Sequence, residues 1–252
     1  MPPGERTIAL ELCYDGSRFH GLQVQHGVLT IQGLVEEALE RIVGRHVRIR
    51  FAGRTDAGVH AMGQVVSFTC ASRMDPGAFR AALNALLPPD IRVLRGWEAP
   101  PGFHPRYDAA ARWYRYLIDW HPERIPFFFR YSLWVHREPD LDLLRSYGEQ
   151  VVGEHDFTSF ATLERGENPR RAVFECRMRG KDRFLAIDIV GNAFLRKMVR
   201  TLVGTFLELE RERQPARAVA DILHRKDRAA AGQTAYAGGL YLMKVFFGSR
   251  GS

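Results

Sequence analysis

Residues 47–70 read VRIRFAGRTDAGVHAMGQVVSFTC and hold the most informative pattern in the chain. Apolar residues alternate with arginines over residues 47–51, which is the period of a β-strand with one buried face. Residues 64–70 are rich in valine, phenylalanine and threonine, which favour a second strand. Between them, residues 53–63 gather glycines and charged side chains. The stretch therefore predicts two strands joined by a glycine-bearing loop.

This loop places Arg54, Asp56 and His60 among three glycines. Glycine allows the backbone to approach a ligand closely and to adopt positive φ angles, so charged side chains held among glycines indicate a functional site. A phosphate-binding P-loop is disfavoured, because that motif requires Lys and then Ser or Thr where Val59 and His60 stand. The remaining alternative is a plain hairpin turn whose arginine and aspartate only pair with each other.

The residues around this stretch predict an α+β arrangement. In the first half, a strand over residues 7–14 precedes an amphipathic helix that starts at Thr30 and stops before Gly44, and a further helix covers residues 77–87. In the second half, strands and helices follow in a similar order. The expected strands cover residues 112–120, 171–179, 183–190 and 240–247, and the expected helices cover residues 141–152, 194–207 and 215–226.

We therefore expect two similar lobes, each a mainly antiparallel sheet with helices on one face, with a central cleft between them. The N-terminal lobe is expected to comprise residues 1–105 and the C-terminal lobe residues 106–252. No Gly/Ser-rich linker separates the halves, which predicts one continuous core with two lobes.

The composition predicts a polyanionic partner. A chain of 252 residues with 46% hydrophobic residues can bury a sizeable core, while its net charge of +7 and pI near 9.6 favour binding to phosphates. The basic residues are 32 arginines and 4 lysines. Arginine pairs with phosphates and stacks on rings, which suits an RNA surface, although a genome that favours arginine codons would give the same bias.

Metal and membrane sites are not expected. The three cysteines form no C-x-x-C pair, and the nine histidines show no H-x-x-x-H spacing. No stretch of 18 apolar residues occurs, and the start of the chain lacks the apolar core of a signal peptide. We expect a cytoplasmic protein that does not associate with membranes.

Two other segments combine cations with aromatic rings. Residues 112–116 read RWYRY, which suits contact with bases and phosphates but equally fits a strand with an aromatic core face. Residues 103–107 read FHPRY in a proline-bearing loop, where a core role is less natural. Arg170 and Arg171 are either phosphate ligands or a solvated turn.

The run Ala52 to Ala61 resembles the signature of the TruA family of tRNA pseudouridine synthases. The resemblance extends along nearly the whole chain, although Leu22 stands where the family often has tryptophan and residues 163–171 match least. Further matching runs lie at residues 14–21, 30–33, 103–107, 112–116, 153–157, 191–200 and 239–242.

The resemblance implies a pseudouridine synthase fold and a role for each matched residue. It implies that Asp56 is the catalytic nucleophile, that Tyr114 stacks on the flipped uracil, and that Arg54 pairs with Asp56 and assists flipping. An aspartate carboxylate is ionised in neutral water, so it can attack without a metal. No cofactor is expected, because the reaction is an isomerisation. Expected tRNA-binding residues are Phe103, His104, Arg106, Tyr107, Arg170, Arg171 and Arg200.

The resemblance also implies a substrate and an assembly. The expected substrate is uridine at positions 38, 39 and 40 in the anticodon stem-loop of tRNA, and the expected assembly is a homodimer that binds tRNA. The target base must leave its stack, at a cost of a few kcal/mol. The alternative is a non-catalytic RNA-binding or RNA chaperone module, in which Asp56 would have only a structural role.

Overall fold

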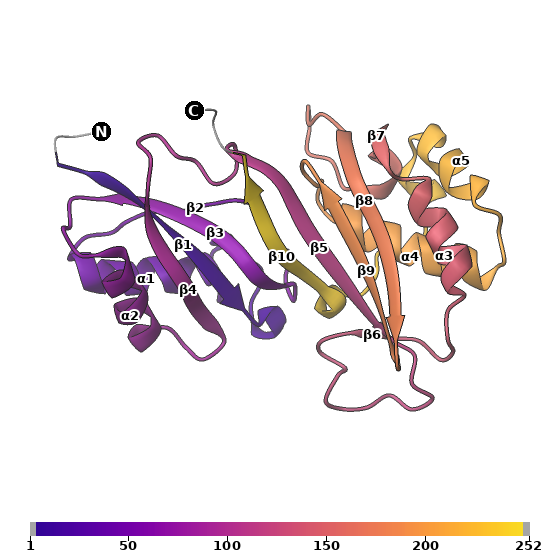
Figure 1. The fold of residues 1–252 in the computed structure, drawn as a ribbon, viewed down its shortest axis with the longest axis horizontal. Coiled ribbons are helices and arrows are strands. Elements are labelled where there is room, and N and C mark those ends of the chain that lie inside the picture. The colour runs from indigo at the N-terminus through magenta and orange to yellow at the C-terminus, as the bar shows by residue number, and fades with distance from the viewer. Residues whose placement is uncertain (1–3, 249–252) are drawn as a thin grey trace. The chain divides into compact units, whose positions relative to one another are not determined.

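The computed structural model describes residues 4–248, which divide into two compact units. The first unit contains the residues up to Ala110 together with the described residues from Leu242 onward, and the second runs from Ala111 to Tyr241. Each unit combines antiparallel strands with helices (Figure 1). The predicted α+β class is therefore confirmed.

The sheet of the first unit is built around β1 (Arg6–Tyr14), which lies between two antiparallel neighbours. These neighbours are β4 (Ile91–Ala99) and β3 (His60–Cys70). The short strand β2 (Arg50–Phe51) also pairs with β3, and β10 (Leu240–Phe247) follows β3 in the strand order. Because β1 has a partner on each side, its central residues are almost completely buried.

Two helices cover the sheet of the first unit. Helix α1 (Ile31–Val43) begins where the Thr30 hydroxyl accepts a hydrogen bond from the Gly33 N–H, and it ends at Gly44 with φ 73°. This glycine adopts the left-handed conformation that commonly ends a helix. Helix α2 (Pro76–Leu86) packs against β4 and contacts α1, so both helices lie on the same side of the sheet (Figure 1).

The second unit has a sheet with the order β5-β9-β8-β7. These strands are β5 (Ala109–Asp119), β9 (Phe184–Gly191), β8 (Arg170–Lys181) and β7 (Gly153–Asp156), and each neighbouring pair is antiparallel. The short strand β6 (Leu133–Trp134) runs parallel to β5. The expected antiparallel sheet is thus present in this part of the chain.

The helices of the second unit are α3 (Leu141–Glu149), α4 (Met198–Arg211) and α5 (Arg217–Arg225). Helix α3 packs against β8 and also contacts α4. Short 3₁₀ helices complete the described elements: η1 (Gly16–Arg18), η2 (Thr158–Phe160), η3 (Arg228–Ala230) and η4 (Ala237–Gly239).

The strand predicted over residues 47–51 is shorter than expected, because only β2 is paired with a neighbouring strand. The N–H of Ile49 donates to the carboxylate of Glu36 in α1 instead of to a strand carbonyl. Because the Glu36 carboxylate, and not a neighbouring strand, accepts this N–H, the chain at Ile49 stays extended without strand pairing.

The helix predicted from Phe194 begins later, at Met198. Lys197 has φ 64°, a left-handed conformation that cannot be part of a right-handed helix, and it separates the helix from the preceding turn. Strand β4 was not predicted at all, because residues 91–99 mix charged and apolar positions whose pairing with β1 is not visible in the local pattern.

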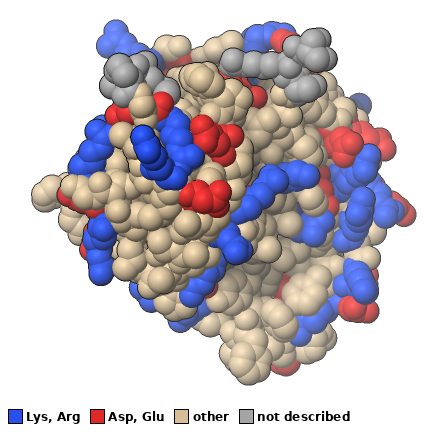
Figure 2. All heavy atoms as spheres, turned by 60° about the vertical axis from the view of Figure 1, so that its left-hand side comes forward, with Lys and Arg blue, Asp and Glu red and all other residues tan. Residues whose placement is uncertain are grey.

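Lysine and arginine side chains are spread over the face shown in Figure 2, with acidic side chains interspersed among them. Many arginines among residues 4–248 form ion pairs. Arg6 lies 2.8 Å from Glu98, for example, and Arg18 lies 3.0 Å from Asp90. An exposed arginine without an acidic neighbour is therefore a better candidate for binding an external anion than an arginine that forms an ion pair.

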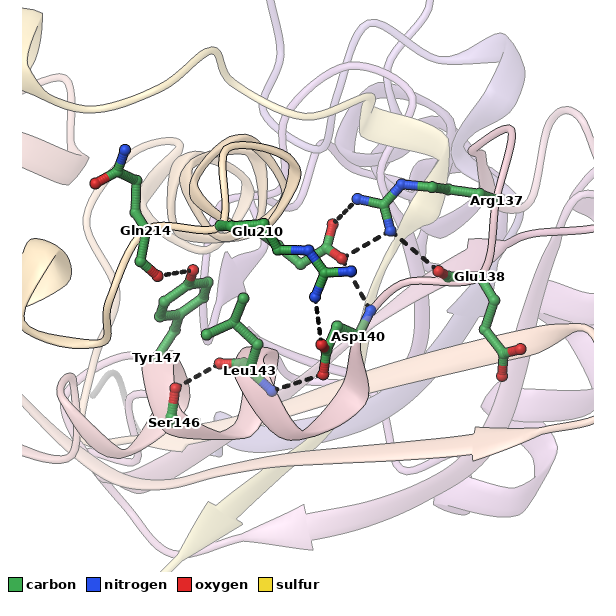
Figure 3. A network of polar contacts seen from close by, with 9 residues as sticks. Arg137, Glu138, Asp140, Leu143, Ser146, Tyr147, Glu210 and Gln214 are labelled. Carbon is green, nitrogen blue, oxygen red and sulfur yellow. Dashed lines mark hydrogen bonds and ion pairs between the residues drawn. The ribbon is translucent and has the colours of Figure 1, made fainter.

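A polar network joins the start of α3 to the end of α4 (Figure 3). The carboxylate of Glu210 is buried and accepts two hydrogen bonds from the Arg137 guanidinium, at 2.8 and 2.7 Å. It also accepts the backbone N–H of Asp140 at 2.9 Å, while Arg213 donates to the Asp140 carboxylate at 2.6 Å. Burial of a charged group is tolerated here because each carboxylate oxygen has a donor.

Candidate active site and nucleic-acid surface

The glycine-bearing loop lies in the first unit, where it joins β2 to β3. Arg54 is exposed and Asp56 is half-exposed, whereas Thr55 between them is buried. The backbone turns after Asp56, since its carbonyl accepts the N–H of Val59 at 3.1 Å. The loop therefore presents its two charged side chains outward while its intervening residue faces the interior.

The last residue of β1 and a residue of the segment that follows it hold Thr55 in place. The Tyr14 phenol oxygen lies 2.8 Å from the Thr55 hydroxyl oxygen, and this contact is buried. The Thr55 carbonyl accepts the N–H of Leu22 at 3.1 Å. Because both the side chain and the carbonyl of Thr55 are bonded, the chain immediately before Asp56 has little freedom to move.

The residues after Asp56 are held by the same segment. The N–H of Gly16 lies 3.0 Å from Nδ1 of His60, and the Asp15 carboxylate lies 3.2 Å from that nitrogen. A deprotonated Nδ1 accepts from Gly16, and a protonated Nδ1 donates to Asp15. In both states the buried imidazole ties the start of β3 to the turn that follows β1.

Close backbone packing adds to these bonds. A Cβ atom on Gly16 would lie 2.0 Å from the carbonyl oxygen of Val59, a distance that no side chain can occupy. Gly21 has φ 90°, and a Cβ atom there would lie 2.7 Å from the Thr55 carbonyl oxygen. Only glycine allows the segment after β1 to pack directly on the backbone of the loop.

The basic and aromatic loop over residues 103–107 also belongs to the first unit. Phe103 packs against Phe247, with ring centroids 5.2 Å apart, and this contact fixes one end of the loop. Tyr107 is 74% exposed, and its ring lies 4.4 Å from the imidazole of His104 and 5.8 Å from the guanidinium carbon of Arg106. The structure thus brings these four predicted tRNA-binding side chains into one patch.

Tyr114 lies on β5 in the second unit. Its side chain is 7% exposed, and its ring meets Phe194 edge to face, with centroids 5.1 Å apart. Tyr116, two residues further along the same face, is fully buried and donates to the Tyr236 carbonyl at 2.7 Å. The predicted aromatic core face of this strand is therefore present.

The other arginines that were expected to bind tRNA already have partners within the second unit. Arg170 donates to Glu154 at 2.9 Å, and this pair is exposed. Arg171 is largely buried and donates to the carbonyl of Asn168 at 2.7 Å. Arg200 donates to the carbonyl of Ala235 at 2.9 Å. Each of these bonds would compete with a phosphate for the same guanidinium.

Within residues 4–248, no three His, Cys, Asp or Glu side chains lie together in a way that could hold a metal ion. None of the helices in this part of the chain is long and apolar enough to cross a membrane.

Comparison with known proteins decides the family. The profile of the family described as tRNA pseudouridine synthase matches residues 13–108 and 149–248. The chain belongs to this family. A tRNA pseudouridine synthase A from Thermotoga neapolitana is 41% identical over 245 residues, covering 96% of this chain and 100% of the relative. One from Aeromonas hydrophila is 42% identical, covering 94% of this chain and 89% of the relative.

The match to the tRNA pseudouridine synthase family includes both the glycine-bearing loop and the segment that holds it. The pseudouridine synthase fold implied by the sequence is thereby confirmed. Sequence reasoning did not identify Tyr14 or Gly16 as parts of the site, since each is far from Asp56 along the chain. The signal that pointed to them was the glycine-bearing run over residues 14–21, which the resemblance had already included.

Proposed function

We propose that Asp56 is the nucleophile with which this tRNA pseudouridine synthase isomerises uridine to pseudouridine. The observation that carries the proposal is that the loop is fixed on both sides of Asp56. Tyr14 contacts Thr55 before it, and Gly16 contacts His60 after it. Asp56 itself is half-exposed. A carboxylate that is accessible and already positioned needs no rearrangement of the loop when the substrate arrives.

The reaction needs only this carboxylate and proton transfers. Asp56 attacks C6 of uracil or C1′ of ribose, and the bond between N1 and C1′ breaks. The uracil turns, a bond forms between C5 and C1′, and the bond to Asp56 breaks. The proton on C5 is released and N1 takes up a proton. Substrate and product contain the same atoms, so no oxidant, reductant or second substrate takes part.

Arg54 and Tyr114 are proposed to act on the base that leaves the stack. Arg54 is exposed beside Asp56, where its guanidinium can occupy the space that the flipped base leaves. Tyr114 is proposed to place its ring against the uracil, and its edge-to-face contact with Phe194 supports a fixed orientation of that ring.

The tRNA surface is proposed to include the patch over residues 103–107 and several arginines of the second unit. Exposed rings beside cations suit unstacked bases and phosphates, which supports a role for this patch. The arginines would exchange their internal carbonyl and carboxylate partners for phosphate oxygens. The proposed contacts are Phe103, His104, Arg106, Tyr107, Arg170, Arg171 and Arg200.

The target is proposed to be uridine at positions 38, 39 and 40 of the anticodon stem-loop, modified by a cytoplasmic homodimer. The net charge of +7 supports binding to a large polyanion such as tRNA. The relatives named tRNA pseudouridine synthase A support this substrate class.

The decisive experiment compares the natural chain with the Asp56→Asn variant on tRNA tritiated at C5 of uracil. Asparagine has nearly the same size but is a poor nucleophile, so tritium release is expected to stop while tRNA affinity stays within about twofold. With the natural chain, release is expected only from the anticodon arm. Undiminished release by Asp56→Asn would exclude Asp56 as the nucleophile.

The same variant tests the alternative of a non-catalytic RNA-binding or chaperone module. That alternative predicts no tritium release by the natural chain and a lower free energy of unfolding for Asp56→Asn, because Asp56 would have only a structural role. Equal unfolding curves together with lost tritium release would support the enzyme and exclude the module.

A further inference from the structure

A short basic segment precedes the glycine-bearing loop. Along residues 46–50, His46, Arg48 and Arg50 are exposed, whereas the intervening Val47 and Ile49 are 5% and 2% exposed. This alternation places three basic side chains on one side of an extended chain. Alternate residues of such a chain are about 6.6 Å apart, which is close to the separation of successive phosphates along one nucleic-acid strand.

A buried carboxylate and a neighbouring strand fix the backbone of this segment. The buried carboxylate of Glu36 accepts the N–H of Ile49 at 2.9 Å and the side-chain amide of Gln32 at 2.7 Å. One step further on, Arg50 is paired with Ser67 in the ladder between β2 and β3. The basic side chains therefore extend from a fixed backbone, which reduces the entropy lost when a ligand binds.

A hollow of about 480 Å³ lies beside this segment, within the first unit. Its lining is mainly polar, so it is suited to a hydrated, charged ligand rather than an apolar one. The lining residues are Glu5, the basic segment with Arg45, and the strand residues Ser67, Phe68 and Thr69.

The positive charge at this hollow is only partly neutralised. Arg45 forms an ion pair with Glu5 at 2.7 Å, and His46 lies 3.6 Å from Glu40. Arg48 and Arg50 have no acidic partner among residues 4–248. Arg48 and Arg50 are exposed at alternate positions of an extended chain, so both positive charges lie on one side of it and favour an anionic ligand there.

A separate observation connects the hollow to the patch over residues 103–107. Partial burial and the nearby positive charge of Arg50 lower the pKa of His104 below its ordinary value, with burial the larger cause. The two side chains are thus close enough to interact electrostatically. Arg50 at the hollow and His104 in the patch over residues 103–107 therefore lie near one another in the first unit.

We propose that Arg48 and Arg50 bind the phosphodiester backbone of RNA along this hollow. The inference rests on the proposed function, since it extends the tRNA surface beyond the residues that the family resemblance indicates. Two arginines at alternate positions grip two successive phosphates, while the patch over residues 103–107 contacts the adjoining nucleotides. The contact carries no sequence information and adds affinity only.

The test measures tRNA affinity as a function of salt for the Arg48→Ala/Arg50→Ala variant. Loss of two phosphate contacts is expected to weaken binding about tenfold and to reduce the slope of log K against log salt by about 1.5. The matched control is Arg73→Ala/Arg80→Ala, which removes two exposed arginines of the same unit from positions outside the hollow. This control is expected to keep the natural slope to within about 0.3.

An Arg48→Lys/Arg50→Lys variant keeps both charges, so most of the salt slope should return. The proposal would be overturned if Arg48→Ala/Arg50→Ala and Arg73→Ala/Arg80→Ala had the same salt slope. It would also be overturned if Arg48→Ala/Arg50→Ala bound tRNA as tightly as the natural chain. Because binding requires no turnover, failure of the proposed function would be seen separately, as a chain that binds tRNA yet forms no pseudouridine.

Discussion

The phenol oxygen of Tyr14 lies 2.8 Å from the hydroxyl oxygen of Thr55, although 41 residues separate them in the chain. Burial raises the pKa of Tyr14 to about 12, so its hydroxyl keeps its proton at every pH at which the protein would function. The bond therefore persists between the last residue of β1 and the residue next to Asp56. It links the central strand of the sheet to the proposed nucleophile.

Replacing Tyr14 with phenylalanine removes this bond and leaves the buried Thr55 hydroxyl with one partner fewer. We expect the free energy of unfolding to fall by about 1 to 2 kcal/mol. We expect the single-turnover rate of pseudouridine formation to fall about tenfold, because a loop that is less well held positions Asp56 less often. Affinity for tRNA should not change.

The control is Tyr147→Phe, which removes the hydrogen bond that Tyr147 donates to the Gln214 carbonyl at 2.6 Å in the second unit. This variant should lose similar stability while keeping the natural rate. If both variants lost the same fraction of the rate, the effect would reflect general destabilisation and not the position of Asp56.

Gly16→Ala tests the close packing between η1 and the loop. The new Cβ atom would lie 2.0 Å from the Val59 carbonyl oxygen, so the backbone must move apart. We expect a loss of about 3 kcal/mol in the free energy of unfolding, measured by urea titration, together with strongly reduced activity. Gly27→Ala is the control for backbone strain without a clash, since Gly27 has φ 76° but nothing lies within 4 Å of the added atom. It should cost about 1 kcal/mol.

Removing the Glu210 carboxylate from the network in Figure 3 is expected to destabilise the second unit. Glu210→Ala leaves the Arg137 guanidinium and the Asp140 N–H without their shared acceptor. We expect the free energy of unfolding to fall by about 3 kcal/mol. Glu212→Ala is the comparison, because Glu212 is exposed and lies 3.9 Å from Arg211. That surface pair should contribute less than about 0.5 kcal/mol.

Stability is expected to fall in acid. The N–H of Leu143 and the guanidinium of Arg213 hold the pKa of Asp140 below its ordinary value of 3.8, despite some desolvation. A carboxyl whose pKa is lower in the folded chain stabilises it above pH 4, and this contribution disappears as the pH falls through the folded value. Asp140→Asn keeps a capping side chain and loses the charge, so its unfolding free energy should decrease less between pH 5 and pH 2. An unchanged pH dependence would contradict this assignment.

Local sequence patterns were sufficient for the elements whose ends carry their own signals. Helix α1 begins after Thr30 and ends before Gly44, as the capping residues predicted. Strand β10 also has its predicted limits. In each case the residues that determine the element are neighbours in the chain, so the pattern contains the information that sets the structure.

The sequence contains the residue types of the site but not their geometry. The run around Asp56 resembles a known signature, so the residues alone indicate the family. The residue types around Asp56 do not by themselves show that Thr55 is buried while Arg54 and Asp56 are accessible. That distinction depends on Tyr14 and Leu22, which are distant in the chain and contact the loop only in the folded structure.

The sequence by itself determined the α+β class, the caps of α1, the basic charge and the family to which the chain belongs. Only the tertiary structure decided that β4 pairs with β1, that Glu36 keeps Ile49 out of the ladder, and that Arg48 and Arg50 lie beside a hollow without acidic partners among the described residues. The physical reason is that capping and periodicity act between neighbours, whereas burial, close packing and charge balance depend on residues that folding brings together.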